Sequence, residues 1–254
     1  MLRRLVPVWG GLIVLAIFCR ITKEIGLAYQ GYCMANRKEV ILGILYLSEV
    51  ATSALVNLAV GVSFIYTLVI AVIRFYKNIF SGEGYFTMCM PFKADAHILC
   101  KAITAFCCII LTIVVSAAAE LIFIFSIDGM KDTADAITIA AEQINLLGTV
   151  CIVELIILIP VMIASAILSL YAVTAFGQNF KSKFGGFVLG YFICDIGLDV
   201  IYSLYIGVGL IILPIARDSV VIAVLLGGFI LLQVVLCVLF YLFTRYRIKN
   251  RLNI

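Results

Sequence analysis

Charged residues are scarce in this sequence. Only 13% of its 254 residues are Asp, Glu, Lys or Arg, and 65% are hydrophobic. An ordinary soluble domain has roughly 25% charged and roughly 45–50% apolar residues. A water-soluble globule of this length could not cover so much apolar surface, so the composition indicates a membrane protein.

Several signatures of catalysis and ligand binding are also missing. The sequence has no G-x-x-x-x-G-K-[ST], so the chain has no P-loop with which to bind ATP. It has no C-x-x-C pair with a histidine cluster for zinc, no intramembrane hydrolase motif and no basic run typical of nucleic-acid binding. We therefore expect no catalytic residue, no metal or cofactor in this chain, and no nucleic-acid partner.

The hydrophobic residues form long uncharged blocks, each near the length that a helix needs to cross a bilayer. They predict spans at about 5–22, 48–73, 102–127, 149–176, 185–213 and 219–243. The first block follows Arg3 and Arg4 but lacks a small-x-small cleavage pattern before Arg20, so we expect a retained span rather than a signal peptide. Without linkers or repeats, residues 1–254 are expected to form a single all-α transmembrane domain.

The distribution of basic residues predicts the orientation. With the N-terminus inside, twelve Lys and Arg residues fall on the cytoplasmic side and six on the external side. Short loops rich in Lys and Arg tend to stay in the cytoplasm. We therefore expect a six-span helical bundle with both termini in the cytoplasm, with the acidic connection 128–148 outside.

The longest predicted cytoplasmic connection, residues 74–101, reads RFYKNIFSGEGYFTMCMPFKADAHILCK. It is too polar to span the membrane and too apolar for a free tail. Such a composition suits an amphipathic segment on the membrane face that presents side chains to a cytoplasmic partner. The alternative is an interfacial anchor with no partner.

The order E-G-Y-F-T-M-C-M-P-F in this connection resembles that in permease subunits of the type-2 class of bacterial ABC exporters, in a Gram-positive branch. The matching positions are Glu83, Gly84, Tyr85, Thr87, Pro91 and Lys101. The six-span layout resembles that family over nearly the whole chain. One departure is that only MLRR precedes the first block, whereas members of the family usually begin with an amphipathic cytoplasmic helix.

The resemblance implies that this segment is a coupling helix docking into a separate cytoplasmic ABC ATPase subunit, which would hold the ATP and magnesium. Apolar side chains at Tyr85, Phe86, Met88 and Phe92 would fill its groove, and Thr87 belongs to the same coupling segment. Glu83 would fix the register, Gly84 would permit close approach, and Pro91 would end the helix.

The resemblance also implies assembly and a location. A second permease copy or a paralogue would complete the transporter in a bacterial plasma membrane. The expected activity is export of an amphipathic substrate such as a peptide antibiotic, a lipid or a cell-wall precursor.

Two sets of polar residues lie within the predicted spans. Asp195 and Asp199 are four residues apart, so they share a helix face with Tyr202. Charged groups inside a bilayer usually line a wet cavity or face another helix, so this stripe indicates a transport path, a subunit interface or a structural polar cluster. Its use as a proton relay in a proton-coupled secondary transporter is the alternative function.

Glu49, Glu120 and Glu154 form the second set and lie toward the predicted external side of three spans. They suit a polar ring at an outer gate, or three carboxylates that each reach the headgroup region. The fifth span also contains GFVLG at 186–190, a G-x-x-x-G pattern that permits close helix packing.

Overall fold

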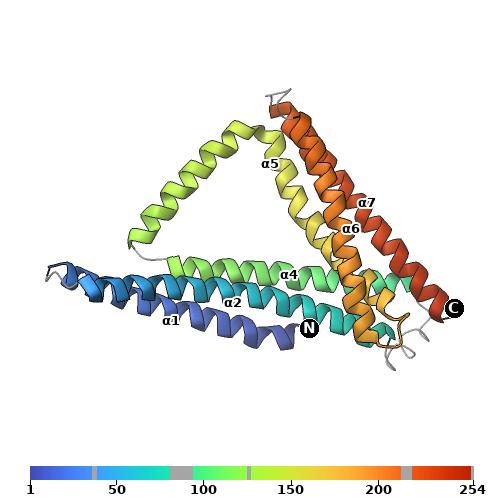
Figure 1. Cartoon of the computed structure of the whole chain (residues 1–254), viewed down its shortest axis with the longest axis horizontal. Coiled ribbons are helices and arrows are strands. Elements are labelled where there is room, and N and C mark those ends of the chain that lie inside the picture. The colour runs from blue at the N-terminus through green and yellow to red at the C-terminus, as the bar shows by residue number, and fades with distance from the viewer. Residues whose placement is uncertain (36–38, 81–93, 125–126, 213–218, 253–254) are drawn as a thin grey trace. The chain divides into compact units, whose positions relative to one another are not determined.

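The computed structural model describes the chain apart from residues 36–38, 81–93, 125–126, 213–218 and 253–254, and its described part is helical except for Met1 and the connection 178–182 (Figure 1). The helices are α1 (Leu2–Ala35), α2 (Glu39–Phe80), α4 (Ala94–Ile124), α5 (Ile127–Gly177), α6 (Lys183–Ile212) and α7 (Ser219–Leu252). Within this part of the chain, six helices are long and apolar enough to cross a membrane. The prediction of an all-α, six-span protein is confirmed, and the chain is a multi-pass membrane protein.

Helices suit these segments because hydrocarbon offers no hydrogen-bond partner to the backbone, which a helix satisfies within itself. Several hydroxyl side chains also bond to carbonyls within their own helices. Ser63 and Thr67 donate hydrogen bonds to the carbonyls of Val60 and Ser63, at 2.8 Å each. Pro160 lies inside α5, where a transmembrane helix tolerates it.

The helices extend beyond the predicted spans. α2 continues to Phe80 and α4 begins at Ala94, so both ends of the predicted connection 74–101 are helical. α5 begins at Ile127, so it also covers the predicted external connection 128–148. Hydropathy marks where a helix meets lipid, whereas the helix itself can continue through polar residues. Residues 128–148 contain no Pro, and their two glycines do not end α5.

The chain divides into two compact units, and α2, α4 and α5 contribute to both. The first unit contains residues 1–70 and 107–139, and the second contains residues 71–106 and 140–254. That the whole chain forms a single domain stays a prediction.

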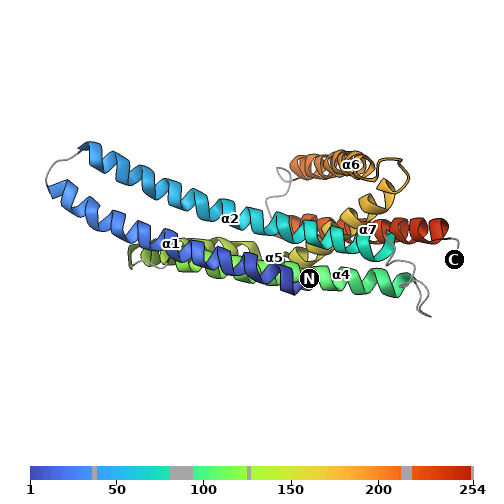
Figure 2. The same cartoon turned by 90° about the horizontal axis from the view of Figure 1, so that it is seen from below.

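In the first unit, α1 and the adjoining parts of α2 and α4 lie side by side (Figures 1 and 2). Three small clusters of buried residues hold them together. Their members are Leu5, Trp9, Ile70 and Cys108; Leu12, Ala16 and Ala119; and Cys19, Val56 and Phe123.

The second unit contains most of α5 with α6 and α7. α5 and α6 approach closely at glycines on both sides of the connection 178–182. A Cβ atom at Gly186 would lie 2.6 Å from the Gly177 carbonyl oxygen, and one at Gly190 would lie 2.8 Å from the Phe176 ring. The G-x-x-x-G pattern at 186–190 therefore lies at a close helix contact, as the sequence predicts.

Candidate functional site

The predicted coupling residues lie outside the described part of the chain. They fall within 81–93 and are Glu83, Gly84, Tyr85, Phe86, Thr87, Met88 and Pro91. The structure does place the helix ends that border this segment, namely the last turns of α2 and the first turns of α4. Both ends belong to the second unit, so their contacts decide which helices a force on the segment would move.

The end of α2 is held against α5 by two aromatic rings. Phe75 is fully buried and stacks on Tyr171, with ring centroids 3.8 Å apart and an interplanar angle of 7°. Ile79, one turn further along α2, is also buried. Aromatic side chains bury large areas, so this stack is a firm attachment between the two helices.

The start of α4 is attached to both α5 and α7. The Tyr171 hydroxyl donates a hydrogen bond to the Lys101 carbonyl at 3.2 Å, so the same tyrosine contacts α2 and α4. In the first turn of α4, Asp95 Oδ1 lies 2.9 Å from Nε of Arg245 on α7. Tyr241, one turn before Arg245 on α7, lies next to Asp95. Both borders of segment 81–93 are therefore anchored to later helices.

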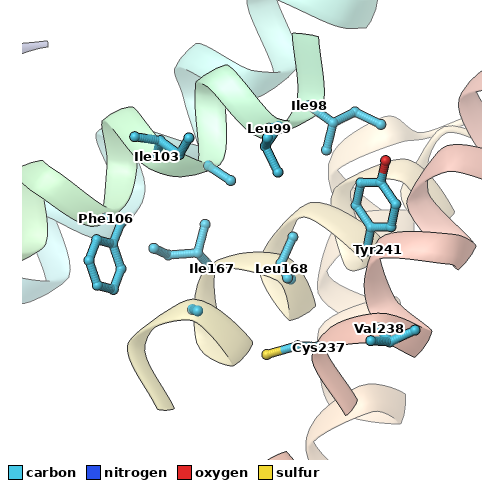
Figure 3. A pocket seen from close by; sticks show the side chains of 11 residues that line it. Ile98, Leu99, Ile103, Phe106, Ile167, Leu168, Cys237, Val238 and Tyr241 are labelled. Carbon is cyan, nitrogen blue, oxygen red and sulfur yellow. The ribbon is translucent and has the colours of Figure 1, made fainter. Parts of the chain in front are cut away.

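A groove of about 370 Å³ lies beside this ionic contact, between α4, α5 and α7 (Figure 3). Its volume falls in the range of about 300–1,000 Å³ that is typical of small-molecule sites. The lining is apolar except for the Tyr241 hydroxyl and the Cys237 thiol. The lining residues are Ile98, Leu99, Ala102, Ile103, Phe106, Ala164, Ile167, Leu168, Cys237, Val238 and Tyr241.

A buried amide lies between α6 and α7. Gln233 is fully buried, and its Nε2 donates a hydrogen bond to the Tyr202 hydroxyl at 3.0 Å. Its Oε1 has no hydrogen-bond partner among the residues that the structure describes. The rings of Tyr202 and Tyr205 pack against Phe229, and the Tyr205 hydroxyl donates to the Leu225 carbonyl. Tyr202 therefore belongs to the contact between α6 and α7.

The two aspartates of the predicted polar stripe lie differently. Asp195 and Asp199 are both exposed on α6, whereas Tyr202 is half-buried against α7. Within the second unit, the carboxylates thus lie on an outer face rather than in the packed interior. Their predicted place on a transport path or at a subunit interface stays a prediction.

The three glutamates of the predicted outer gate are divided between the units. Glu49 forms an ion pair with Lys23 at 3.6 Å, and Glu120 is half-buried on α4, both in the first unit. Glu154 lies in the second unit, where its Oε1 would be 3.2 Å from a Cβ atom at Gly227. Their assembly into one ring stays a prediction.

Sequence reasoning missed three features of the second unit. Gln233 could have been found from the sequence, because a single amide side chain within an apolar span is unusual. The pairing of Asp95 with Arg245 joins residues 150 positions apart in the sequence, so no local pattern announces it. The groove arises from the packing of three helices and leaves no mark in any one of them.

No family model, curated protein or solved structure matches this chain. The functional assignment therefore depends on the coupling-segment resemblance together with the contacts described above.

Proposed function

We propose that this multi-pass membrane protein is the permease subunit of an ABC exporter that works with a separate cytoplasmic ATPase subunit. The observation that carries the proposal is the run E-G-Y-F-T-M-C-M-P-F at residues 83–92, placed between the second and third spans. The chain has no P-loop of its own, so hydrolysis would take place on the partner.

The anchoring of the helix ends supports this proposal. An ATPase that gripped residues 81–93 would pull on the last turns of α2 and the first turns of α4. Phe75 and Tyr171 join these turns to α5, and Asp95 joins them to α7 through Arg245. Packed side chains transmit displacement because protein interiors have low compressibility. Movement of the segment would therefore reach most of the second unit.

The exposed carboxylates support a second membrane subunit. A charged residue near the bilayer centre costs about 2.5–3.5 kcal/mol on insertion scales, so such residues rarely face lipid. Asp195 and Asp199 are exposed on α6 near the middle of its span. A second permease copy or paralogue that covers this face would remove both carboxylates from hydrocarbon. The assembled transporter would lie in a bacterial plasma membrane and export an amphipathic peptide, lipid or cell-wall precursor.

Co-purification tests the proposal. The tagged chain, solubilised in mild detergent from its native host, should carry a P-loop ATPase identifiable by mass spectrometry. Substitution of Glu83→Ala together with Tyr85→Ala should lower the recovered ATPase by about tenfold or more, since anchor residues dominate such contacts. Asn179→Ala, at an exposed position on the same predicted side, is the matched control and should leave recovery unchanged. Absence of an ATPase, or equal recovery from both variants, would refute the proposal.

Energy sources separate this proposal from a proton-coupled transporter. Export from inverted vesicles should require ATP and should survive a protonophore that collapses the proton gradient. The alternative predicts export that stops with the protonophore, persists without ATP and is lost in Asp195→Asn or Asp199→Asn. That result would identify a proton-coupled transporter in which the two carboxylates carry the protons.

A further inference from the structure

The groove between α4, α5 and α7 has a polarity gradient along its length. At one end, Tyr241 leads to Asp95 and Arg245, and at the other the walls are formed by Phe106 and Ala164. From Ile98 to Phe106 the α4 wall rises by about 12 Å, at about 1.5 Å per residue. The groove therefore resembles a slot for a chain with a polar group at one end.

The mouth of the groove opens among apolar side chains that face outward. Leu99, Ile103 and Val238 line it and are 56%, 55% and 51% exposed. All three lie within helices that are apolar enough to span the membrane. The surroundings of the mouth are thus hydrocarbon, in which lipid chains are the most abundant occupants.

The polar end of the groove has a basic side chain beside it. Arg245 lies one turn beyond Tyr241 on α7 and is paired with the carboxylate of Asp95. The contact with Asp95 engages Nε of Arg245, and half of the arginine side chain is exposed. The guanidinium has five donor hydrogens in a planar fork, so its outer nitrogens can receive a second anion such as a phosphate.

We propose that this groove binds one hydrocarbon chain of an anionic membrane amphiphile, with the anionic headgroup at Arg245. Moving a methylene group from the lipid bilayer into the groove changes the free energy little, because both surroundings are apolar. The hydrocarbon chain therefore has to fit the groove in shape, and the headgroup determines which lipid is preferred. Binding here would place a lipid beside the contacts that anchor α4 to α7. The proposal does not depend on an ATPase partner.

Photo-crosslinking tests the proposal directly. The purified chain is placed in phosphatidylcholine nanodiscs with traces of phosphatidylglycerol that carries a diazirine on one acyl chain, and crosslinked peptides are mapped by mass spectrometry. Labelling should concentrate on residues 98–106, 164–168 and 237–241. Labelling spread evenly over all outward-facing spans would overturn the site.

Two matched variants test the shape of the groove. Ala164→Phe fills it from the α5 wall and should cut the concentrated labelling by about fivefold, a loss of about 1 kcal/mol. Ala166→Phe adds the same ring to an exposed position two residues away and should change nothing. Ala102→Phe fills the groove from the α4 wall instead, so it provides an independent test if Ala164→Phe does not fold. Full labelling in both filled variants would refute the proposal.

The headgroup is tested by exchanging it. A phosphatidylcholine probe with the same diazirine chain should label the groove about fivefold less than the phosphatidylglycerol probe, consistent with one basic residue near an anionic lipid. Arg245→Gln should abolish this difference while the groove still takes up chains. Equal labelling by the two probes in the unaltered protein would show that no anionic headgroup is recognised.

Discussion

Thr112 joins three helices of the first unit through its hydroxyl group. Trp9 on α1 donates its ring N–H to Thr112 Oγ1 at 3.2 Å, and the hydroxyls of Thr67 on α2 and Thr112 on α4 are 3.0 Å apart. All three side chains are buried. In an apolar environment, a polar group that loses its partner keeps the full cost of desolvation.

Thr112→Val should therefore destabilise the protein by about 1–2 kcal/mol, because it leaves the Trp9 N–H without its acceptor at almost unchanged side-chain volume. Thr104→Val is the control, since Thr104 donates its hydrogen bond to the Cys100 carbonyl one turn earlier on the same helix, at 2.8 Å. Its cost should stay below about 0.5 kcal/mol. Thermal unfolding in detergent measures both, and equal melting shifts would contradict the expectation.

Gln233 gives a second comparison at single residues. Tyr202→Phe removes the hydroxyl that receives the buried Gln233 amide, so it should cost about 1–2 kcal/mol. Gln233→Leu removes the amide itself, including the Oε1 that has no partner in the described structure, and should cost less. Unfolding by a denaturing detergent in a mixed micelle ranks the two variants. The reverse order would show that the Gln233 amide makes a stabilising contact besides its hydrogen bond to Tyr202.

At the scale of elements, the contact between α5 and α6 depends on the absence of a side chain at Gly186. Gly186→Ala places a methyl group 2.6 Å from the Gly177 carbonyl oxygen, so the helices must separate, at a cost of about 1–3 kcal/mol. Gly197→Ala, on the same helix, meets open space and should be neutral or slightly stabilising. Thermal melting monitored by size-exclusion chromatography distinguishes the two variants. Equal melting temperatures would show that α5 and α6 do not make this close contact.

The elements also show what the sequence predicts well. Each uncharged block of the sequence became a helix, because burial in lipid leaves the backbone no alternative. Hydropathy did not predict the helix ends. For example, α2 continues through the charged residues Arg74 and Lys77 and ends at Phe80. The contacts of Asp95 and of the groove depend on how separate helices pack, and periodicity within one helix contains no such information.

At the scale of the whole molecule, six spans place the two termini on the same side of the membrane, and the basic residues predict that this side is the cytoplasm. In a cysteine-free background, Thr138→Cys should react with a membrane-impermeant maleimide in intact cells. Asn179→Cys should react only after the cells are permeabilised. Both positions are exposed in the structure, so accessibility does not limit labelling. The opposite pattern would invert the molecule and leave segment 81–93 outside, beyond the reach of any ATPase.

The short connection 178–182 and its flanking glycines have a consequence for biosynthesis. α5 and α6 can pack together before α7 has left the ribosome, because their contact needs only Gly177, Gly186 and neighbouring aromatic rings. Lys181 and Lys183 at the tip resist passage through the bilayer. The two helices would therefore enter the translocon's lateral gate as a preformed hairpin, and α7 would be added to it as the last segment synthesised.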